Sequence, residues 1–163
     1  QTLILKSCGF EKKHKQIAMS MDLRLAPAPK DRVLIQKVSN KTLAIIWSQL
    51  FEQAFGYKIS ASTVSQTMES IGYYIGKNNG NPIGTAVLFM DQQGIAGIHS
   101  MGIIPSQRRK GFAEELLIQI MNIAQKKGAT YATLQASEMG EGLYLKTCFQ
   151  KDFVIKTFNI KKK

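Results

Sequence analysis

The fold of this chain can be inferred outward from one stretch, PSQRRKGFAEELLIQIMNIAQKKG, which spans residues 105–128. Apolar side chains recur there at three- and four-residue spacing, which predicts an amphipathic helix over residues 112–127 that ends at Gly128. Directly before Gly111 stand three cations: Arg108, Arg109 and Lys110. Positive charge at a helix N-terminus opposes the helix dipole unless an anion is bound there. We therefore expect an anionic ligand at this turn.

The residues before the helix make this expectation more specific. Residues 95–104 predict a strand, so a strand, a turn and a helix follow one another. A helix start leaves about four backbone N–H groups unpaired, and a loop that presents them beside Arg and Lys is an anion site. Gly111 lets a ligand approach the backbone closely, and Ala113 is small for the same reason. We predict a bound phosphate group; a basic turn that starts a surface helix is the alternative.

Two well-known phosphate loops are excluded by the same residues. The Gly-Lys-Ser/Thr ending of nucleoside-triphosphatase loops is absent, and one glycine cannot make a dinucleotide fingerprint.

The rest of the chain predicts further strands and helices without strict alternation, which indicates an α+β domain on a mixed sheet. Asn40 is a plausible N-cap and Gly56 a stop for one of the helices. Breaks are expected at residues 26–29, 78–81 and 91–94. The other predicted strands cover residues 16–25, 32–38, 72–76, 83–90, 131–136 and 153–160. The other predicted helices cover residues 41–55, 60–70 and 141–147.

Length and charge limit the classes of function. A chain of 163 residues with 44% hydrophobic content corresponds to about one domain with a real core. The net charge of +11 favours an acidic partner such as nucleic acid, anionic lipid or a polyphosphate cofactor. However, the lysines are scattered, with a triplet only at residues 161–163, so a solvated surface explains most of the charge. Aromatic and basic residues do not interleave as a nucleic-acid binder requires, and no apolar run is long enough to span a membrane.

The two cysteines, Cys8 and Cys148, form neither a disulfide framework nor a metal-binding spacing. Such cysteine usage suits a reducing cytoplasm, which we expect as the location. We expect both cysteines to be buried as small apolar residues.

A short repeat connects the two ends of the chain. Residues 3–12, LILKSCGFEK, resemble residues 143–151, LYLKTCFQK, apart from one extra residue in the first copy. A chance match is one explanation. The other is that residues 1–25 are the tail of a preceding copy, with a helix end and a strand, and that residues 26–163 are the domain itself. We expect the strand of this tail to pair with the sheet of the main domain or of a neighbouring chain.

The loop also carries a family resemblance. Arg108-Arg-Lys-Gly-Phe-Ala113 resembles the Arg/Gln-x-x-Gly-x-Gly/Ala pyrophosphate-binding signature of the GNAT-type N-acetyltransferases. The resemblance covers residues 83–160 well and residues 25–82 by element order alone. It implies a GNAT-like mixed, mostly antiparallel twisted sheet of about six to seven strands, flanked by about four helices. With the repeat, it makes this chain a candidate C-terminal part of a tandem GNAT protein.

The resemblance implies roles for individual residues. The pyrophosphate of acetyl-CoA would bind the loop amides, and its pantetheine arm would pair with the preceding strand like an added strand. A backbone N–H would polarise the acetyl carbonyl. Tyr144 matches the tyrosine that can protonate the departing thiolate; a core aromatic is the alternative. The implied cofactor-binding residues are Met101, Ile103, Arg108, Arg109, Lys110, Gly111, Phe112 and Ala113. No metal is implied.

The sequence departs from the family pattern at two places. Many members carry a glutamate as general base on the strand, where this chain has Gly97. His99 shares the strand face of Gly97, and its ordinary pKa of ~6.5 suits an amine substrate. A structural role for His99 is the alternative, and Glu138, Glu141 or an ordered water are other candidate bases. The usual Gly-Phe after the closing helix is here Cys148-Phe149, a departure that bears on the local turn and not on the function.

The leading hypothesis is an N-acetyltransferase that moves an acetyl group from acetyl-CoA to an amine by direct attack. The alternative is a catalytically silent acyl-CoA-binding sensor or scaffold domain. The acceptor is a small-molecule or peptide amine that the sequence does not identify, and its pocket is expected from residues 41–70. A homodimer or an intramolecular repeat is the expected protein partner, and no nucleic acid is expected.

Overall fold

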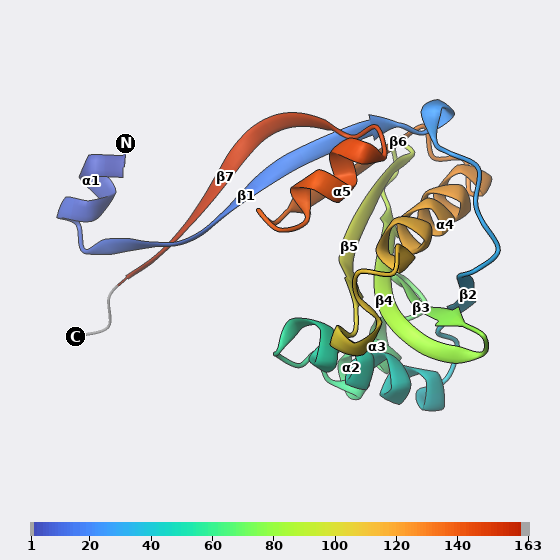
Figure 1. Cartoon of the computed structure of the whole chain (residues 1–163). Helices are drawn as coiled ribbons and strands as arrows, with labels where there is room; N and C mark the ends of the chain where they lie inside the picture. Colours follow the sequence, from blue (N-terminus) through green and yellow to red (C-terminus); the bar gives the residue numbers. More distant parts are fainter. Residues whose placement is uncertain (1, 161–163) are drawn as a thin grey trace.

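The computed structural model describes residues 2–160 (Figure 1). The lysine triplet at residues 161–163 lies outside the described residues. Seven strands form one sheet in the order β2-β3-β4-β5-β6-β1-β7, and β5–β6 is its one parallel pair. The strands are β1 Phe10–Asp22, β2 Leu34–Lys37, β3 Gly72–Asn78, β4 Asn81–Met90, β5 Ile95–Ile103, β6 Tyr131–Ala136 and β7 Gln150–Ile160. The helices are α1 Thr2–Ser7, α2 Lys41–Phe55, α3 Ala61–Thr67, α4 Phe112–Lys126 and α5 Glu141–Lys146. The α+β fold is confirmed, with α1 as a fifth helix.

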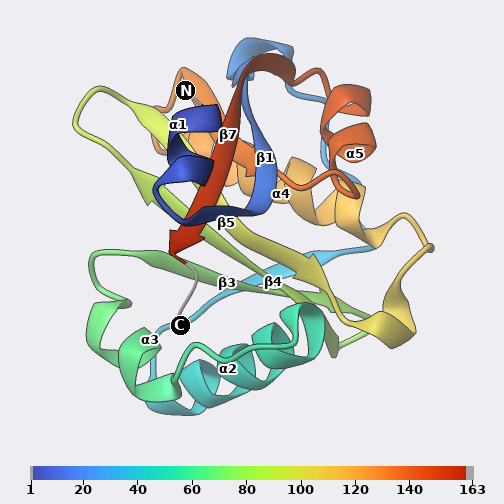
Figure 2. The same ribbon diagram turned by 90° about the vertical axis from the view of Figure 1, so that its left-hand side faces the viewer.

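Helices cover both faces of the sheet. In Figure 2, α2 and α3 lie below the sheet and α4 and α5 lie above it. The α2 side buries Trp47 and Phe51, whose rings stack with centroids 5.1 Å apart. The α4 side buries Leu116 and Ile120 in a second cluster. The central strands are packed between these two apolar layers, and the site described below is built on their ends.

Local signals set the element boundaries where the sequence carries them. Asn40 caps α2, because its side chain accepts a hydrogen bond from the N–H of Leu43 at 2.9 Å. Gly56 ends α2 in the left-handed conformation with φ 76°. Asn79 and Gly80 are both left-handed, as a two-residue hairpin turn requires, and they join β3 to β4. Both the helix and the hairpin were predicted at these positions.

Strand β1 runs between β6 and β7 and is antiparallel to both. It begins earlier than the predicted residue 16 and ends at Asp22, whose carboxylate accepts a hydrogen bond from the N–H of Arg24 at 3.0 Å and starts a 3-10 turn. Met19 and Met21 are buried in the α4-side core. The N-terminal strand therefore joins the sheet of the main domain, as expected.

Both cysteines are exposed, so the prediction that they are buried is wrong. Each lies in the short turn between a helix end and the following strand, where the chain runs over the surface. Cys148 has φ 69°, a left-handed conformation that glycine adopts far more readily. The turn of the family pattern is thus kept, with a cysteine in the place of glycine.

Candidate functional site

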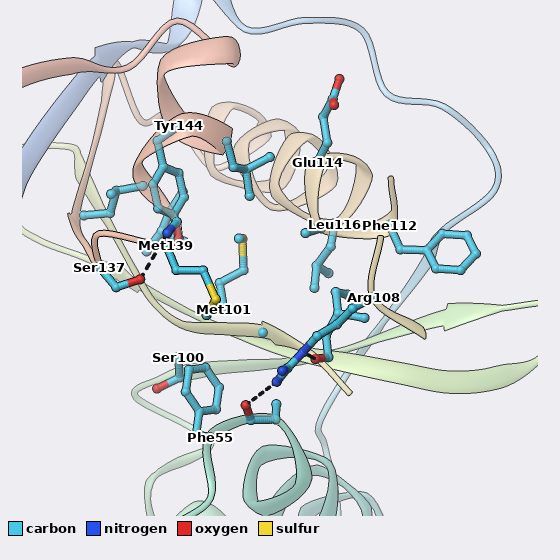
Figure 3. A pocket seen from close by; sticks show the side chains of 18 of the residues that line it. Phe55, Ser100, Met101, Arg108, Phe112, Glu114, Leu116, Ser137, Met139 and Tyr144 are labelled. Carbon is cyan, nitrogen blue, oxygen red and sulfur yellow. Dashed lines mark hydrogen bonds between the residues drawn. The ribbon is translucent and has the colours of Figure 1, made fainter. Parts of the chain in front are cut away.

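The site begins where two parallel strands separate. Strands β5 and β6 pair through Ile95–Gly97 and residues 131–133. Beyond Gly97 the paired register ends, and a cleft of about 990 Å³ opens between the two strands (Figure 3). Residues 98–103 form one wall, and Leu134, Gln135 and Ser137 belong to the other. The backbone of β5 thus borders open space where a neighbouring strand would otherwise lie.

A bulge in β5 shapes this wall. Thr85 pairs with Gly102 and Val87 pairs with His99, so two residues of β5 lie opposite one residue of β4. Ser100, within the bulge, has φ 48°. The hydroxyl of the fully buried Thr85 donates a hydrogen bond to the Ser100 carbonyl at 3.0 Å and so holds the bulge in place. A bulge bends its strand and redirects the side chains around it, here toward the cleft.

The loop before α4 borders the cleft with residues of unusual backbone conformation. Arg109 and Gly111 are both left-handed, with φ 60° and 82°. Alternation of this kind turns successive N–H groups toward one concave side, which favours an anion. Among the described residues no side chain caps α4, so the first N–H groups of the helix have no side-chain acceptor, and the positive end of its dipole lies beside this turn. Arg108, Arg109 and Gly111 of the loop border the cleft, as do Phe112 and Ala113 at the start of α4.

The predicted cofactor-binding side chains are used in different ways. Arg108 donates through Nε to the Ile103 carbonyl at 3.0 Å and through Nη2 to the Ala54 carbonyl at 2.8 Å (Figure 3). It therefore ties the loop to β5 and to the C-terminal end of α2, where the helix dipole favours a cation. Lys110 donates to Oε1 of Gln107 at 2.9 Å. Phe112 is buried and points away from the centre of the cleft in Figure 3, so it can offer a ligand its backbone.

Arg32 joins this loop from far away in the sequence, and sequence reasoning missed it. Its guanidinium pairs with the buried carboxylate of Glu115 and lies 5.5 Å from the ring centroid of Phe112. Its Nη2 would be 3.2 Å from a Cβ placed on Gly111. The residues around Arg32 predicted a strand and nothing more. The loop that Arg32 borders follows more than 70 residues later, so no local pattern indicated the contact.

Tyr144 reaches the cleft from the opposite side. Its ring projects from α5 into the cleft (Figure 3), packs edge-on against Phe149 with centroids 5.8 Å apart, and lies beside Gly140. The turn before α5 is held by Ser137, whose Oγ accepts a hydrogen bond from the Gly140 N–H at 3.2 Å. Burial raises the pKa of Tyr144, so its hydroxyl keeps its proton at neutral pH. The structure therefore presents a proton donor to the cleft.

His99 lies across the space above Gly97. Its Nε2 would be 2.8 Å from a Cβ on Gly97, so the imidazole occupies the room that a side chain at that position would need. His99 lines the cleft, and partial burial there lowers its pKa. The neutral ring, with one nitrogen able to accept a proton, is therefore the main form at pH 7.

The other candidate bases are placed less well. The cleft lining, as far as residues 2–160 define it, includes neither Glu138 nor Glu141. Glu141 pairs with Lys151, and Glu138 borders a smaller surface hollow beside Lys12–Lys15 of β1. An ordered water remains compatible with the cleft.

The predicted acceptor region contributes a small part of the cleft. From α2 and the loop after it, Ala54, Phe55 and Tyr57 border the cleft. Gly102 makes this possible, because a Cβ there would lie 2.8 Å from the Phe55 ring. Glu52 pairs with Lys58 at 3.6 Å.

Comparison with known proteins identifies the family. The model of the acetyltransferase (GNAT) family matches residues 41–148, about two thirds of the chain. The chain belongs to the GNAT family. In this GNAT chain, the matched segment contains β5, the loop before α4, α4 itself and Tyr144. No curated protein sequence matches the chain.

Solved structures share the GNAT fold at low sequence identity. A GCN5-related N-acetyltransferase from Kribbella flavida has a TM-score of 0.77 and 16% identity over 99% of this chain and 64% of its own. Another from Sphaerobacter thermophilus has a TM-score of 0.78 and 17% identity over 96% and 54% of the two chains. An IAA acetyltransferase from Bacillus cereus has a TM-score of 0.56 and 20% identity over 70% and 74%. The GNAT chain thus spans 54–64% of the first two relatives.

The GNAT family typically uses acetyl-CoA. Of the helices in residues 2–160, none is long and apolar enough to cross a bilayer.

Proposed function

We propose that this chain is an acetyl-CoA-dependent N-acetyltransferase that acts by direct attack of an amine on the thioester. One observation carries the proposal: a single cleft is bordered by the uncapped start of α4, by the open side of β5, and by His99 and Tyr144. Its volume of about 990 Å³ lies at the upper end of typical ligand pockets, as a long co-substrate requires. The two exposed cysteines suit the reducing cytoplasm as its location.

Acetyl-CoA would lie along the cleft with its charged part at the loop. The diphosphate would accept hydrogen bonds from the N–H groups at Gly111–Ala113, and Arg109 and Arg32 would add positive charge. The pantetheine arm would pair with the backbone of Met101 and Ile103, where β6 has diverged from β5. The Ile103 carbonyl already accepts a hydrogen bond from Arg108, so Met101 is the better backbone partner of the two.

The reaction then needs one base and one acid. His99 takes a proton from the acceptor ammonium, and the neutral amine nitrogen attacks the thioester carbonyl carbon. A backbone N–H of β5 at the bulge would stabilise the negative oxygen that forms. When this intermediate collapses, the C–S bond breaks and Tyr144 donates its proton to the departing thiolate. The nitrogen then loses its second proton, which restores the Tyr144 hydroxyl, and His99 releases its proton to solvent. The products are an acetylated amine and CoA with a free thiol.

The proposal is tested first by binding and then by turnover. We expect CoA to bind with a micromolar Kd in titration calorimetry, and a thiol-release assay over a panel of amines to find an acceptor. Absence of CoA binding up to millimolar concentration would contradict the proposal.

A catalytically silent acyl-CoA-binding domain is the second candidate, and Gly97 is the observation that favours it. Binding of CoA without thiol release across a broad panel of amines would support this candidate. The position of the His99 imidazole over Gly97 favours the active enzyme, because it returns a base to that place.

A further inference from the structure

The sequence repeat is also a repeat in space. Helix α1 and strand β1 form one helix–strand unit, and α5 and β7 form another. In each unit a left-handed residue joins helix to strand, Gly9 with φ 81° and Cys148 with φ 69°. The two strands pair antiparallel, so that the beginning of each lies opposite the end of the other, from Phe10 with Ile160 to Ser20 with Gln150. A local two-fold axis through this ribbon therefore relates the two units.

The surroundings of the two units break this symmetry. Helix α5 packs Leu143 and Tyr144 on the α4-side core. Helix α1 lies at the far end of the ribbon, away from the body of the molecule (Figure 1), and its Ile4 is 67% exposed. The relation that matches Gly9 with Cys148 matches Ile4 with Leu143 and Leu5 with Tyr144. The first unit thus has the apolar face of a closing helix without a core to cover.

Strands β1 and β7 also differ in how far their surroundings cover them. Strand β1 is paired on both edges, by β6 and by β7. Strand β7 lies at the edge of the sheet that residues 2–160 form, and its Phe153 and Ile160 are 64% and 65% exposed. A long edge strand with exposed apolar side chains is a template for pairing with another strand.

We propose that α1 and β7 dock a second unit of the GNAT fold, which precedes α1 in the same polypeptide and uses α1 and β1 as its own closing helix and strand. In the sheet of this chain, β1 lies between β6 and the closing strand β7. By the two-fold relation, β7 lies in the second sheet between the β6-like strand of that unit and its closing strand β1. Each unit thus supplies the strand that completes the other.

The two-fold relation also predicts where the second unit pairs. Strand β6 pairs with the last part of β1, from Ile17 to Asp22. The corresponding part of β7 is residues 156–160, where Phe158 and Ile160 match Met19 and Met21. Both methionines are buried on the core of this chain, and we expect Phe158 and Ile160 to be covered by the second unit in the same way.

A second copy of this chain fits the free surface less well. Its β6 edge is already covered by its own β1, so it has no strand of that type to offer to β7. The required partner is a unit that lacks its own strand beside β6. The inference does not depend on the acetyl-transfer reaction.

Hydrogen exchange tests the pairing. We compare this chain with the full polypeptide that its native gene encodes, and follow the amides of residues 156–160 by NMR. In the full polypeptide, the alternate amides that point away from β1 should exchange at least about tenfold more slowly at every protein concentration. Equal rates overturn the inference, as does a gene that encodes no second GNAT unit. Protection of this chain alone that grows with its concentration also overturns it and indicates a second copy.

A substitution on α1 provides an independent test. Ile4→Asp should lower the Tm of the full polypeptide by about 3 °C or more and leave this chain nearly unchanged, because Ile4 is exposed here. Lys6→Gln on the same helix is the matched control and should change neither protein. An equal effect of Ile4→Asp in both proteins, or none in either, overturns the inference, whatever the outcome for CoA binding.

Discussion

At the residue scale, the cleft shifts the pKa values of two ionisable groups in opposite directions. Burial lowers the pKa of His99 and raises the pKa of Tyr144, so that both are neutral at pH 7. A neutral imidazole accepts a proton and a neutral phenol donates one, which is the division of roles that acid–base catalysis needs.

Removing the Tyr144 hydroxyl should affect turnover more than binding. We expect Tyr144→Phe to lower kcat about 100-fold, as is typical for loss of a general acid, with a small change in the Kd for CoA. Thiol release and calorimetry measure the two quantities. Tyr131→Phe, at an exposed tyrosine outside the cleft lining, is the control and should leave both unchanged. Equal kcat values for wild type and Tyr144→Phe would restrict Tyr144 to packing.

The pH dependence of the reaction should identify His99. The pKa of His99 lies below its ordinary value, so its basic form prevails above that pKa and is lost as the pH falls through it. We expect kcat/KM to fall tenfold per pH unit on this acidic side. In His99→Gln this limb should disappear and kcat/KM on the plateau should drop. A pH profile that keeps its acidic limb in His99→Gln would assign the base to water or to another group.

The left-handed cysteine predicts a gain in stability. A residue with a Cβ at φ 69° costs roughly 1–2 kcal/mol, which the greater freedom of unfolded glycine offsets in part. Cys148→Gly should therefore raise the free energy of unfolding by about 0.5–1 kcal/mol. Chemical denaturation measures this change, and Cys148→Ser, which keeps the Cβ, should show none of it.

At the element scale, the loop before α4 is held by hydrogen bonds from its own side chains. Arg108 joins three elements, since its two bonds reach β5 and the end of α2. The bulge in β5 is held in the same way by Thr85 from β4. The backbone that borders the cleft is thus positioned by hydrogen bonds between neighbouring elements.

Loss of Arg108 should therefore weaken CoA binding by loosening the loop. We expect Arg108→Ala to raise the Kd for CoA about tenfold and Arg109→Ala to raise it several-fold through lost charge. The effect of Arg109→Ala should shrink at high salt, because exposed charges are screened. Lys110→Ala is the control, since its ammonium is bonded to Gln107. Similar Kd values for all three variants would show that the side chains of this loop do not determine affinity.

At the scale of the whole molecule, the N-terminal strand is part of the domain. The match to the family model begins at residue 41, yet β1 lies inside the sheet and buries its side chains in the α4-side core. Strand β1 and the segment that begins at residue 41 therefore share one apolar layer. The free energy of unfolding depends on both segments.

A substitution in β1 measures this dependence. Met19→Ala should lower the free energy of unfolding by about 2–4 kcal/mol, because Met19 is 1% exposed and its loss leaves a cavity. Met139→Ala, at a methionine that is 89% exposed, should change it by less than about 0.5 kcal/mol. A loss below 1 kcal/mol for Met19→Ala would mean that β1 adds little to the fold.

Elements with local signals could be predicted from the amino-acid order: α2 with Asn40 and Gly56, α4 with its basic loop, and Tyr144 on the short helix α5. Spacing, caps and turn residues act within a few positions of one another, so one sequence suffices to predict them. The folded chain was needed to see that β1 runs between β6 and β7, and that Arg32 pairs with Glu115 beside the loop. It also shows that Arg108 bonds to protein carbonyls and that His99 covers Gly97. Strand order, ion pairs and side-chain directions depend on which distant segments pack together, and a linear pattern does not encode that choice locally.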